Sequence, residues 1–377
     1  MIDRRNFLGA SSGLAASLLL PGHALAIGTE PSMLYASACK DAQGRFAALL
    51  FDADTGREVA GVVLPARGHD IAPRPGSEGR LGRELVAFAR RPGNFAVVFG
   101  DTSGASPLWF TSRPDRYFYG HGVFSADGRL LFTSENDFEA GVGRIGVRDA
   151  SGGYKQIGEL PAGGIGSHDL ALLSDRRTLV VANGGIKTHP ATPRLELNLS
   201  SMEPSLTYID SETGDVMEKH TVPPELHQLS IRHLAVGKGD TVIFGCQYRG
   251  PGWQTQQIVG RHRRGRPIEL LTLPDKVGLA MRNYVASLTA DPAGDTVVVA
   301  APRGGLAVVL EVATGRLLGS YTMDSVFGVA PRAGGGFVLT SGNGQLATAR
   351  PIAAGTPIEP RLQALAKAWD NHLVAVR

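Results

Sequence analysis

A repeated unit of short β-strands constrains the fold of this chain more than any other feature. Each unit begins with a strand of alternating small and apolar residues, and a tight turn leads to a second, strongly β-forming strand. Two further strands follow, joined by a D-x-x-T-G turn at 52–56 and again at 210–214. Four antiparallel strands at a period of about 40–65 residues are typical of a β-propeller blade.

Seven first strands can be placed, so the sequence predicts an all-β fold, a seven-bladed β-propeller. The N-terminal part after residue 32 supplies three strands without a first strand, and the chain ends one strand into a unit. We therefore expect N- and C-terminal strands to pair in one closing blade, which leaves no open sheet edge. Six or eight blades stay open as alternatives, because residues 349–369 are irregular and could hold a short helix instead of an outer strand. The seven first strands are expected to begin near His69, His121, His168, Arg232, Ala286, Phe327 and Asn371.

Residues 1–26 have the features of a twin-arginine signal peptide. Arg4 and Arg5 precede Asn6, Phe7 and Leu8, and a weakly apolar segment ends in Ala24-Leu25-Ala26, a small-x-small cleavage site. The apolar stretch is too short to span a bilayer. We expect residues 27–377 to form a single propeller domain in the periplasm, with no membrane span after cleavage.

The charge of the chain argues against a nucleic-acid partner. Lys and Arg number 38 and Asp and Glu number 35, which gives a formal net charge of +3. The one dense basic run, residues 261–266, has the pattern of a turn between two strands. The two cysteines are expected in blades nearly opposite each other, so we expect Cys39 and Cys246 to be free thiols.

Histidines recur at one position of the repeat, at the start of the first strands. Five of the nine histidines after residue 26 occupy the leading or the next position of five consecutive blades. The starts of inner strands ring one mouth of a propeller channel, and imidazole is a common ligand of Zn, Cu, Fe and Ni. The sequence therefore predicts a metal site whose candidate ligands are His69, His121, His168, His233 and His372.

Further polar residues are expected at the same mouth. Second strands run antiparallel to the first, so their ends reach it too, as does a loop insertion at 186–205 that we expect to act as a lid or rim. Glu135, His189 and Cys246 are second-choice metal ligands. Arg232, Arg249 and Arg303 suit an anionic metal chelate or a carboxylate. Asp70 and Asp169 each follow a ring histidine, so they point away from the mouth and are expected to accept hydrogen bonds within a blade or from its neighbour.

A second interpretation of the histidines is structural. Propellers of the WD type place a histidine before a blade in a buried hydrogen-bond network, and "GHG" at 120–122 fits that pattern. The chain contains no G-x-S-x-G elbow, no Walker loop and no C-x-x-C-H haem motif.

The sequence resembles the bacterial domain-of-unknown-function family 1513. The segments that carry the resemblance are "GHDIAPRP", "YGHGVFSADGRLLFTSEND", "GIGSHDLALL", "VANGGIKTHP", "LNLSSMEPSLTYID", "LSIRHLA" and "DNHL". The resemblance implies a periplasmic propeller-like protein whose members tend to be encoded beside imelysin-like and di-haem peroxidase-like proteins. That neighbourhood implies a role in iron acquisition or handling.

Three functions are compatible with these features. The first is a periplasmic metal-associated binding protein, with iron or copper as the metal ion. The second is a propeller enzyme, a metal-assisted lyase, hydrolase or oxidoreductase using the same His and Arg residues. The third is an interaction scaffold with structural histidines and a periplasmic protein partner. The fold alone does not choose among them.

Overall fold

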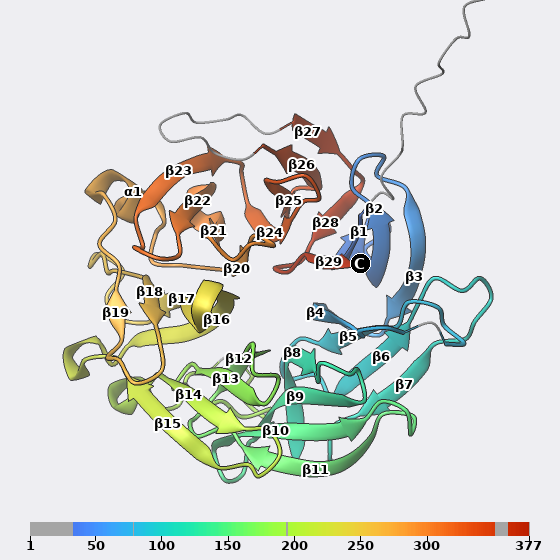
Figure 1. Cartoon of the computed structure of the whole chain (residues 1–377), viewed down its shortest axis with the longest axis horizontal. Helices are drawn as coiled ribbons and strands as arrows, with labels where there is room; N and C mark the ends of the chain where they lie inside the picture. The colour runs from blue at the N-terminus through green and yellow to red at the C-terminus, as the bar shows by residue number, and fades with distance from the viewer. Residues whose placement is uncertain (1–32, 78, 194, 351–360, 377) are drawn as a thin grey trace, which may run out of the picture. The chain divides into compact units, whose positions relative to one another are not determined.

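Seven antiparallel sheets are arranged as blades around a common centre (Figure 1). The computed structural model describes residues 33–77, 79–193, 195–350 and 361–376, which belong to one unit that begins at Met33. The predicted signal peptide, residues 1–26, lies outside the described residues. The sheet order confirms the expected seven-bladed propeller.

Six blades consist of four strands that follow one another in the chain. The first blade contains β4 (Gly68–Pro73), β5 (Leu85–Ala89), β6 (Phe95–Phe99) and β7 (Leu108–Thr111). The second contains β8 (Arg116–Phe124), β9 (Leu130–Asp137), β10 (Val142–Asp149) and β11 (Lys155–Pro161). The third contains β12 (Ser167–Leu172), β13 (Thr178–Asn183), β14 (Ser205–Asp210) and β15 (Val216–Thr221). The fourth blade contains β16 (Leu229–Gly237), β17 (Thr241–Tyr248), β18 (Val259–His262) and β19 (Glu269–Leu270). The fifth contains β20 (Ser287–Ala290), β21 (Thr296–Ala301), β22 (Leu306–Glu311) and β23 (Leu317–Thr322). The sixth contains β24 (Val326–Pro331), β25 (Phe337–Ser341), β26 (Gln345–Ala349) and β27 (Arg361–Ala364).

The closing blade joins the two ends of the propeller, as expected. Its strands β1 (Leu34–Asp41), β2 (Phe46–Asp52) and β3 (Glu58–Leu64) come from the N-terminal side. Its inner strand is split in two, because β28 (Lys367–Trp369) pairs with Cys39–Asp41 and β29 (Val374–Val376) pairs with Leu34–Ala36 of the same strand β1. The irregular segment before β28 holds β27 as an outer strand, so the described part of that blade has four strands.

Middle and outer strands of a blade differ in sequence because they differ in burial. Strands in the middle of a blade are covered on both faces, so β5, β13 and β25 are buried throughout and read as continuous apolar runs. The outer strand β15 alternates between exposed and half-buried residues, as expected where one face meets solvent.

The D-x-x-T-G turns close hairpins through the side chain of their first residue. Oδ1 of Asp210 accepts hydrogen bonds from the backbone N–H groups of Glu212 and Thr213, and Gly214 takes a φ of 82°. Glycine adopts this left-handed conformation without steric cost. The repeated motif is therefore a turn signal and carries no chemistry of its own.

The inner strands β4, β8, β12, β16, β20, β24 and β29 form a ring in which each contacts its neighbours. The described helices are short: α1 (Asp275–Ala280) and the 3-10 turns Leu199–Ser201, Pro224–Leu226, Lys238–Asp240 and Pro302–Gly304. None of them has the length and apolar character needed to cross a membrane.

Candidate metal centre and arginine-lined chamber

Five histidines from five consecutive blades converge on the axis of the propeller. Ring centroids of neighbouring histidines lie 4.6–5.7 Å apart, as in the pairs His121–His372 and His69–His168. Two triads bring one nitrogen of each ring within 4.8 Å of the others, and both triads include His121. The five residues are His69, His121, His168, His233 and His372, the same set that the repeat phase picks out. Four are at most 7% exposed and His372 is half-buried.

The pairing register of the inner strands is interrupted beside these side chains. The pairing register shifts between Gly68 and Ile71 around His69, and between Ser167 and Asp169 around His168. A further shift between Phe118 and Gly122 surrounds His121. In the fourth blade the shift falls at Arg232, and in the closing blade the gap between β28 and β29 contains His372. An extra residue in one strand bends it and redirects nearby side chains, and each of these breaks contains or adjoins one of the five histidines.

Three carboxylates lie behind the histidines. Nδ1 of His121 is 3.1 Å from Oδ2 of Asp70 and 3.4 Å from Oδ1 of Asp169, which come from the two neighbouring blades. Nδ1 of His69 is 3.4 Å from Oδ1 of Asp370. A carboxylate oxygen can only accept, so the Nδ1–H group of His121 donates and its Nε2 lone pair faces the centre. Asp70 and Asp169 therefore accept from a neighbouring blade, as expected, although the strand register breaks beside both of them.

Burial keeps the five imidazoles neutral. It lowers the pKa of His69, His168 and His233 well below 6.5, and neighbouring histidines lower it further. Burial followed by the charge of His121 lowers the pKa of His372 to about 4, and burial raises the pKa of Asp169 to about 6. Neutral rings have lone pairs available for a metal. Within the described residues, these buried ring nitrogens have no hydrogen-bond partner: His121 Nε2, His168 Nδ1, His233 Nδ1, His233 Nε2 and His372 Nε2.

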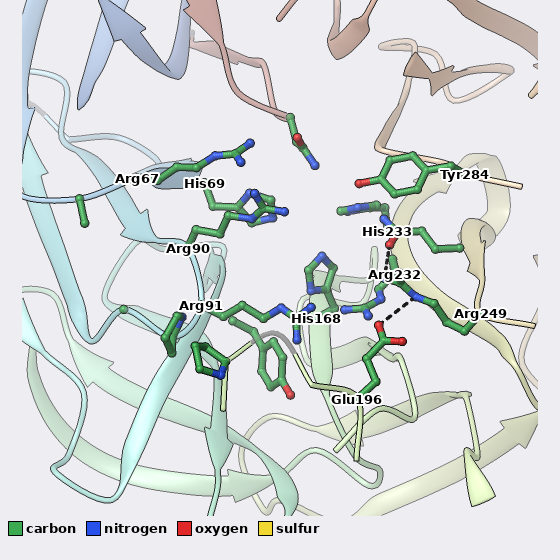
Figure 2. Close-up of a pocket in the computed structure, with 17 residues that line it drawn as sticks. Arg67, His69, Arg90, Arg91, His168, Glu196, Arg232, His233, Arg249 and Tyr284 are labelled. Atoms are coloured by element: carbon green, nitrogen blue, oxygen red, sulfur yellow. Dashed lines mark hydrogen bonds and ion pairs between the residues drawn. The ribbon is translucent and has the colours of Figure 1, made fainter. Parts of the chain in front are cut away.

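A cavity of about 760 Å³ opens onto the histidines. His69, His168 and His233 form one part of its lining, with the ring of Tyr284 near His233 (Figure 2). Tyr119 lines it too, with its ring centroid 6.2 Å from that of His168. Pro193 and Glu196, from the insertion at 186–205, also line it. The expectation that this insertion forms part of the rim is therefore confirmed. We call this cavity the arginine chamber, after its lining residues Arg67, Arg90, Arg91, Arg232 and Arg249.

Positive charge is concentrated in the chamber. Burial, followed by the charges of Arg249 and Arg91, lowers the pKa of Arg232 to about 9. Nε and Nη2 of Arg232 are buried and have no hydrogen-bond partner among the described residues. Arg249 donates from Nη2 to Oε1 of Gln247 at 2.8 Å, and its Nε lies 3.4 Å from Oε1 of Glu196. One carboxylate therefore faces several guanidinium groups.

A comparison with models of known protein families identifies one family that matches most of the chain. A model of the family described as "Protein of unknown function (DUF1513)" matches residues 62–376.

The chain belongs to the DUF1513 family.

No curated protein matches this DUF1513 chain. Solved structures match it through the fold. A chain of Kuenenia stuttgartiensis hydrazine synthase aligns with a TM-score of 0.58 and 14% identity over 87% of this chain and 95% of that one. A chain from the crystal structure of a mitotic checkpoint complex aligns with a TM-score of 0.54 and 11% identity, over 79% and 81% of the two chains. At such identities the likeness concerns the propeller architecture alone.

Four other candidates in this DUF1513 protein lie apart from the five histidines. Glu135 is fully buried inside its blade, where Oε1 accepts hydrogen bonds from Thr133 at 2.7 Å and Arg148 at 2.9 Å. His189 is partly exposed, with Nε2 3.6 Å from Oε1 of Glu139.

The remaining two are also not part of the chamber lining. The guanidinium of Arg303 stacks 4.3 Å from the ring centroid of Tyr284, and it is Tyr284 that lines the chamber. Cys246 is buried among apolar residues, and burial raises its thiol pKa. Cys39 and Cys246 are both free, as expected.

Several chamber residues of this DUF1513 protein are missing from the predicted set. Arg90 and Arg91 directly follow β5, the second strand of its blade. The rule that second-strand ends reach the mouth, which located Arg249, therefore applies to them as well. Arg67 precedes β4 by one residue and pairs with Asp370. Asp370 itself lies in the break between β28 and β29, which strand periodicity does not reveal.

Proposed function

We propose that this protein is a periplasmic metal-binding protein whose five axial histidines hold one transition-metal ion, iron or copper. The observation that carries the proposal is the set of buried ring nitrogens that converge without hydrogen-bond partners. Leaving a buried polar atom unpaired costs about 1–3 kcal/mol. The unpartnered nitrogens belong to four of the five rings, and one nitrogen from each ring of the two triads lies within 4.8 Å of the others, which is consistent with a ligand set that a metal ion satisfies.

The type of ligand supports the choice of metal. Neutral imidazoles suit Fe, Cu, Ni and Zn, whereas Ca²⁺ and Mg²⁺ require oxygen ligands. A metal held at about 2.0–2.1 Å by imidazole nitrogens needs those nitrogens about 3–4 Å apart. The spacing within 4.8 Å is close to that, so small ring movements would complete the site. Among these metals, the genomic neighbourhood that the family resemblance implies favours iron.

The geometry favours one ion per chain. The two histidine triads share His121, and Nδ1 of that ring already faces Asp70 and Asp169. His121 has only Nε2 left to offer, and one nitrogen lone pair binds one metal. The hydrogen bond from Nδ1 to a carboxylate also orients the ring and raises its basicity, which is the usual arrangement behind metal-bound histidines.

Metal analysis tests the proposal. Protein purified from the periplasm, and metal-free protein titrated anaerobically with Fe²⁺, Cu²⁺ and Zn²⁺, should bind close to one equivalent. The variants His168→Ala and His233→Ala should weaken binding by at least tenfold. The matched control is His227→Ala, because His227 lies outside the cluster and contacts the Pro224 carbonyl. Wild-type protein that binds none of the three metals would overturn the proposal.

The periplasmic placement is supported by the twin-arginine pattern at Arg4 and Arg5. Replacing both by Lys should block export, and fractionation of cells expressing the double variant measures this. Normal periplasmic levels of the variant would contradict the proposed route.

An enzyme is the second candidate, and the arginine chamber favours it. A cavity of about 760 Å³ beside the histidines leaves room for a small molecule to reach a bound metal. A metal with an open coordination position can act as a Lewis acid or activate water. Metal-loaded protein whose metal still binds an added exogenous ligand, such as azide, would support this candidate.

A further inference from the structure

We infer that the arginine chamber binds an organic anion with at least two separated carboxylate groups, which lies against the histidine cluster. The inference deepens the proposed function by naming the class of molecule that the site takes. We expect the metal-free protein to bind the anion, and the metal-loaded protein to bind it more tightly. Only the second of these effects rests on the proposed metal.

The charge of the lining points to an anion. Five guanidinium groups line the chamber, and among its described lining residues Glu196 is the only carboxylate. Glu196 approaches Arg249 at 3.4 Å, and Arg67 pairs with Asp370. The other three arginines of the lining have no carboxylate partner among the described residues; they are Arg90, Arg91 and Arg232.

Arg232 gives the most specific indication of a ligand. Its side chain is 3% exposed, and both Nε and Nη2 lack a hydrogen-bond partner within the described part of the chain. These two nitrogens form one edge of the guanidinium fork, and such an edge matches the two oxygens of a carboxylate. The residue adjacent to it, His233, lines the chamber as well, so a carboxylate held by Arg232 would lie close to the histidines.

The placement of the arginines indicates the length of the anion. Arg67, Arg90 and Arg91 flank β4 and β5 of the first blade, whereas Arg232 and Arg249 belong to the fourth blade. Figure 2 shows the two groups on opposite sides of the chamber, with His168 between them. An anion with negative groups at both ends matches both.

The volume and the metal ligands favour carboxylates over phosphate. A cavity of about 760 Å³ is in the size range of organic ligand sites, and inorganic phosphate would leave most of it empty. A carboxylate oxygen is also a good additional ligand for a metal that already has imidazole ligands. A di- or tricarboxylate could therefore be held by arginines at its ends and contact the metal between them.

Isothermal titration tests the inference with tricarballylate as the probe, because it has three carboxylates and chelates metals weakly. Metal-free wild-type protein should bind it, and inorganic phosphate, pyrophosphate and the neutral polyol sorbitol should bind at least tenfold more weakly. Arg232→Gln should lower the affinity for tricarballylate by at least tenfold. The control is Arg261→Gln, because Arg261 lies on β18 and pairs with Glu269 outside the chamber.

Two further arms keep the inference falsifiable. If Arg232→Gln fails to fold, Arg249→Gln tests the same loss, because this residue is half-buried and its removal disturbs less of the core. Repeating the titration after loading with Zn²⁺ should raise the affinity for tricarballylate, and by reciprocity the anion should raise the affinity for the metal. No binding to metal-free protein, equal binding of pyrophosphate, or an unchanged affinity in both arginine variants would overturn the inference. Anion binding without any metal binding would overturn the proposed metal site and leave the anion site standing.

Discussion

Nδ1 of His121 lies 3.1 Å from Oδ2 of Asp70, across the boundary between two blades. The contact fixes which nitrogen of the ring faces the axis, and it links the inner strands β4 and β8 through a partly buried pair. A carboxylate in this position strengthens a metal-binding imidazole without touching the metal.

Replacing this carboxylate should weaken metal binding while the five histidines remain. Asp70→Asn removes the negative charge behind His121, so we expect the metal affinity to fall by about 10–100-fold. Competition against a chromophoric chelator measures the change. Asp295→Asn is the control, because Asp295 pairs with Lys238 on the surface. Equal affinities of wild type and Asp70→Asn would contradict the role assigned to this contact.

Two histidine variants should separate metal binding from stability. His233→Ala removes a ring whose two nitrogens have no partner among the described residues, so the metal-free protein should lose little stability beyond the packing of the ring. His121→Ala removes the donor to Asp70 and Asp169, and the metal-free protein should lose about 1–3 kcal/mol more. Thermal melting of the metal-free forms gives the difference, while both variants should bind metal poorly. Equal melting points would argue against the hydrogen bonds from His121.

Replacing Glu135 should lower the stability of the protein without changing its metal binding. Its carboxylate and the guanidinium of Arg148 are both buried, and they are 2.9 Å apart. Removing one partner of a buried pair typically costs about 3–5 kcal/mol, so Glu135→Ala should lower the melting point strongly. Its metal stoichiometry should stay that of the wild type wherever the variant is folded. Loss of metal from a stable Glu135→Ala protein would restore Glu135 as a ligand.

Deleting residues 371–377 should prevent normal folding. The deletion removes β29, which pairs with Leu34–Ala36, and the buried side chain of Leu373. It also removes the backbone carbonyl of His372 that accepts a 2.6 Å hydrogen bond from Ser37. We expect a large drop in the thermal midpoint, and about 2–5 kcal/mol for the milder variant Leu373→Ala. A truncated protein with an unchanged midpoint would contradict the closure of the ring by β29.

Glu218 should make the stability depend on pH below its ordinary pKa. Burial raises the pKa of this carboxyl, but hydrogen bonds from Gly265 N–H, His220 and Arg264 outweigh burial and lower it to about 2. The unfolded chain takes up this proton near pH 4.5, before the folded one does, so the stabilisation is complete above about pH 4.5 and is lost as the pH falls toward 2.

The variant Glu218→Gln should reveal this contribution. It should be less stable than wild type by about 1 kcal/mol at pH 7, and the difference should vanish near pH 2. Denaturant unfolding at a series of pH values measures it. Glu212→Gln is the control, because Glu212 is 69% exposed. A difference that stays constant down to pH 2 would contradict the lowered pKa.

The repeat pattern in the sequence was sufficient to predict the propeller and the five histidines. Strand periodicity and turn residues are local properties, and in a closed ring the same phase of each unit must meet at the axis. His69, His121 and His168 could therefore be placed together from spacing alone. The register shifts beside them depend on the partner strand, and no local pattern predicted them.

Residues outside the repeat phase were harder to place. Glu135 sits at the end of a second strand and was a reasonable ligand by position, but its partner Arg148 on the next strand keeps it inside the blade. Glu196 belongs to an insertion that has no counterpart in the other units, so only the fold brings it to Arg249. Such pairings depend on tertiary packing, which a single sequence does not encode in its spacing.

The split inner strand of the closing blade makes the histidine cluster depend on closure of the ring. His372 lies in the gap between β28 and β29, and β29 pairs with β1, which is far from it in the sequence. His372 therefore reaches the axis only when this pairing has formed. A metal ion held by all five rings would bind the closed ring better than an open one, so by mass action the bound ion would stabilise the closed form.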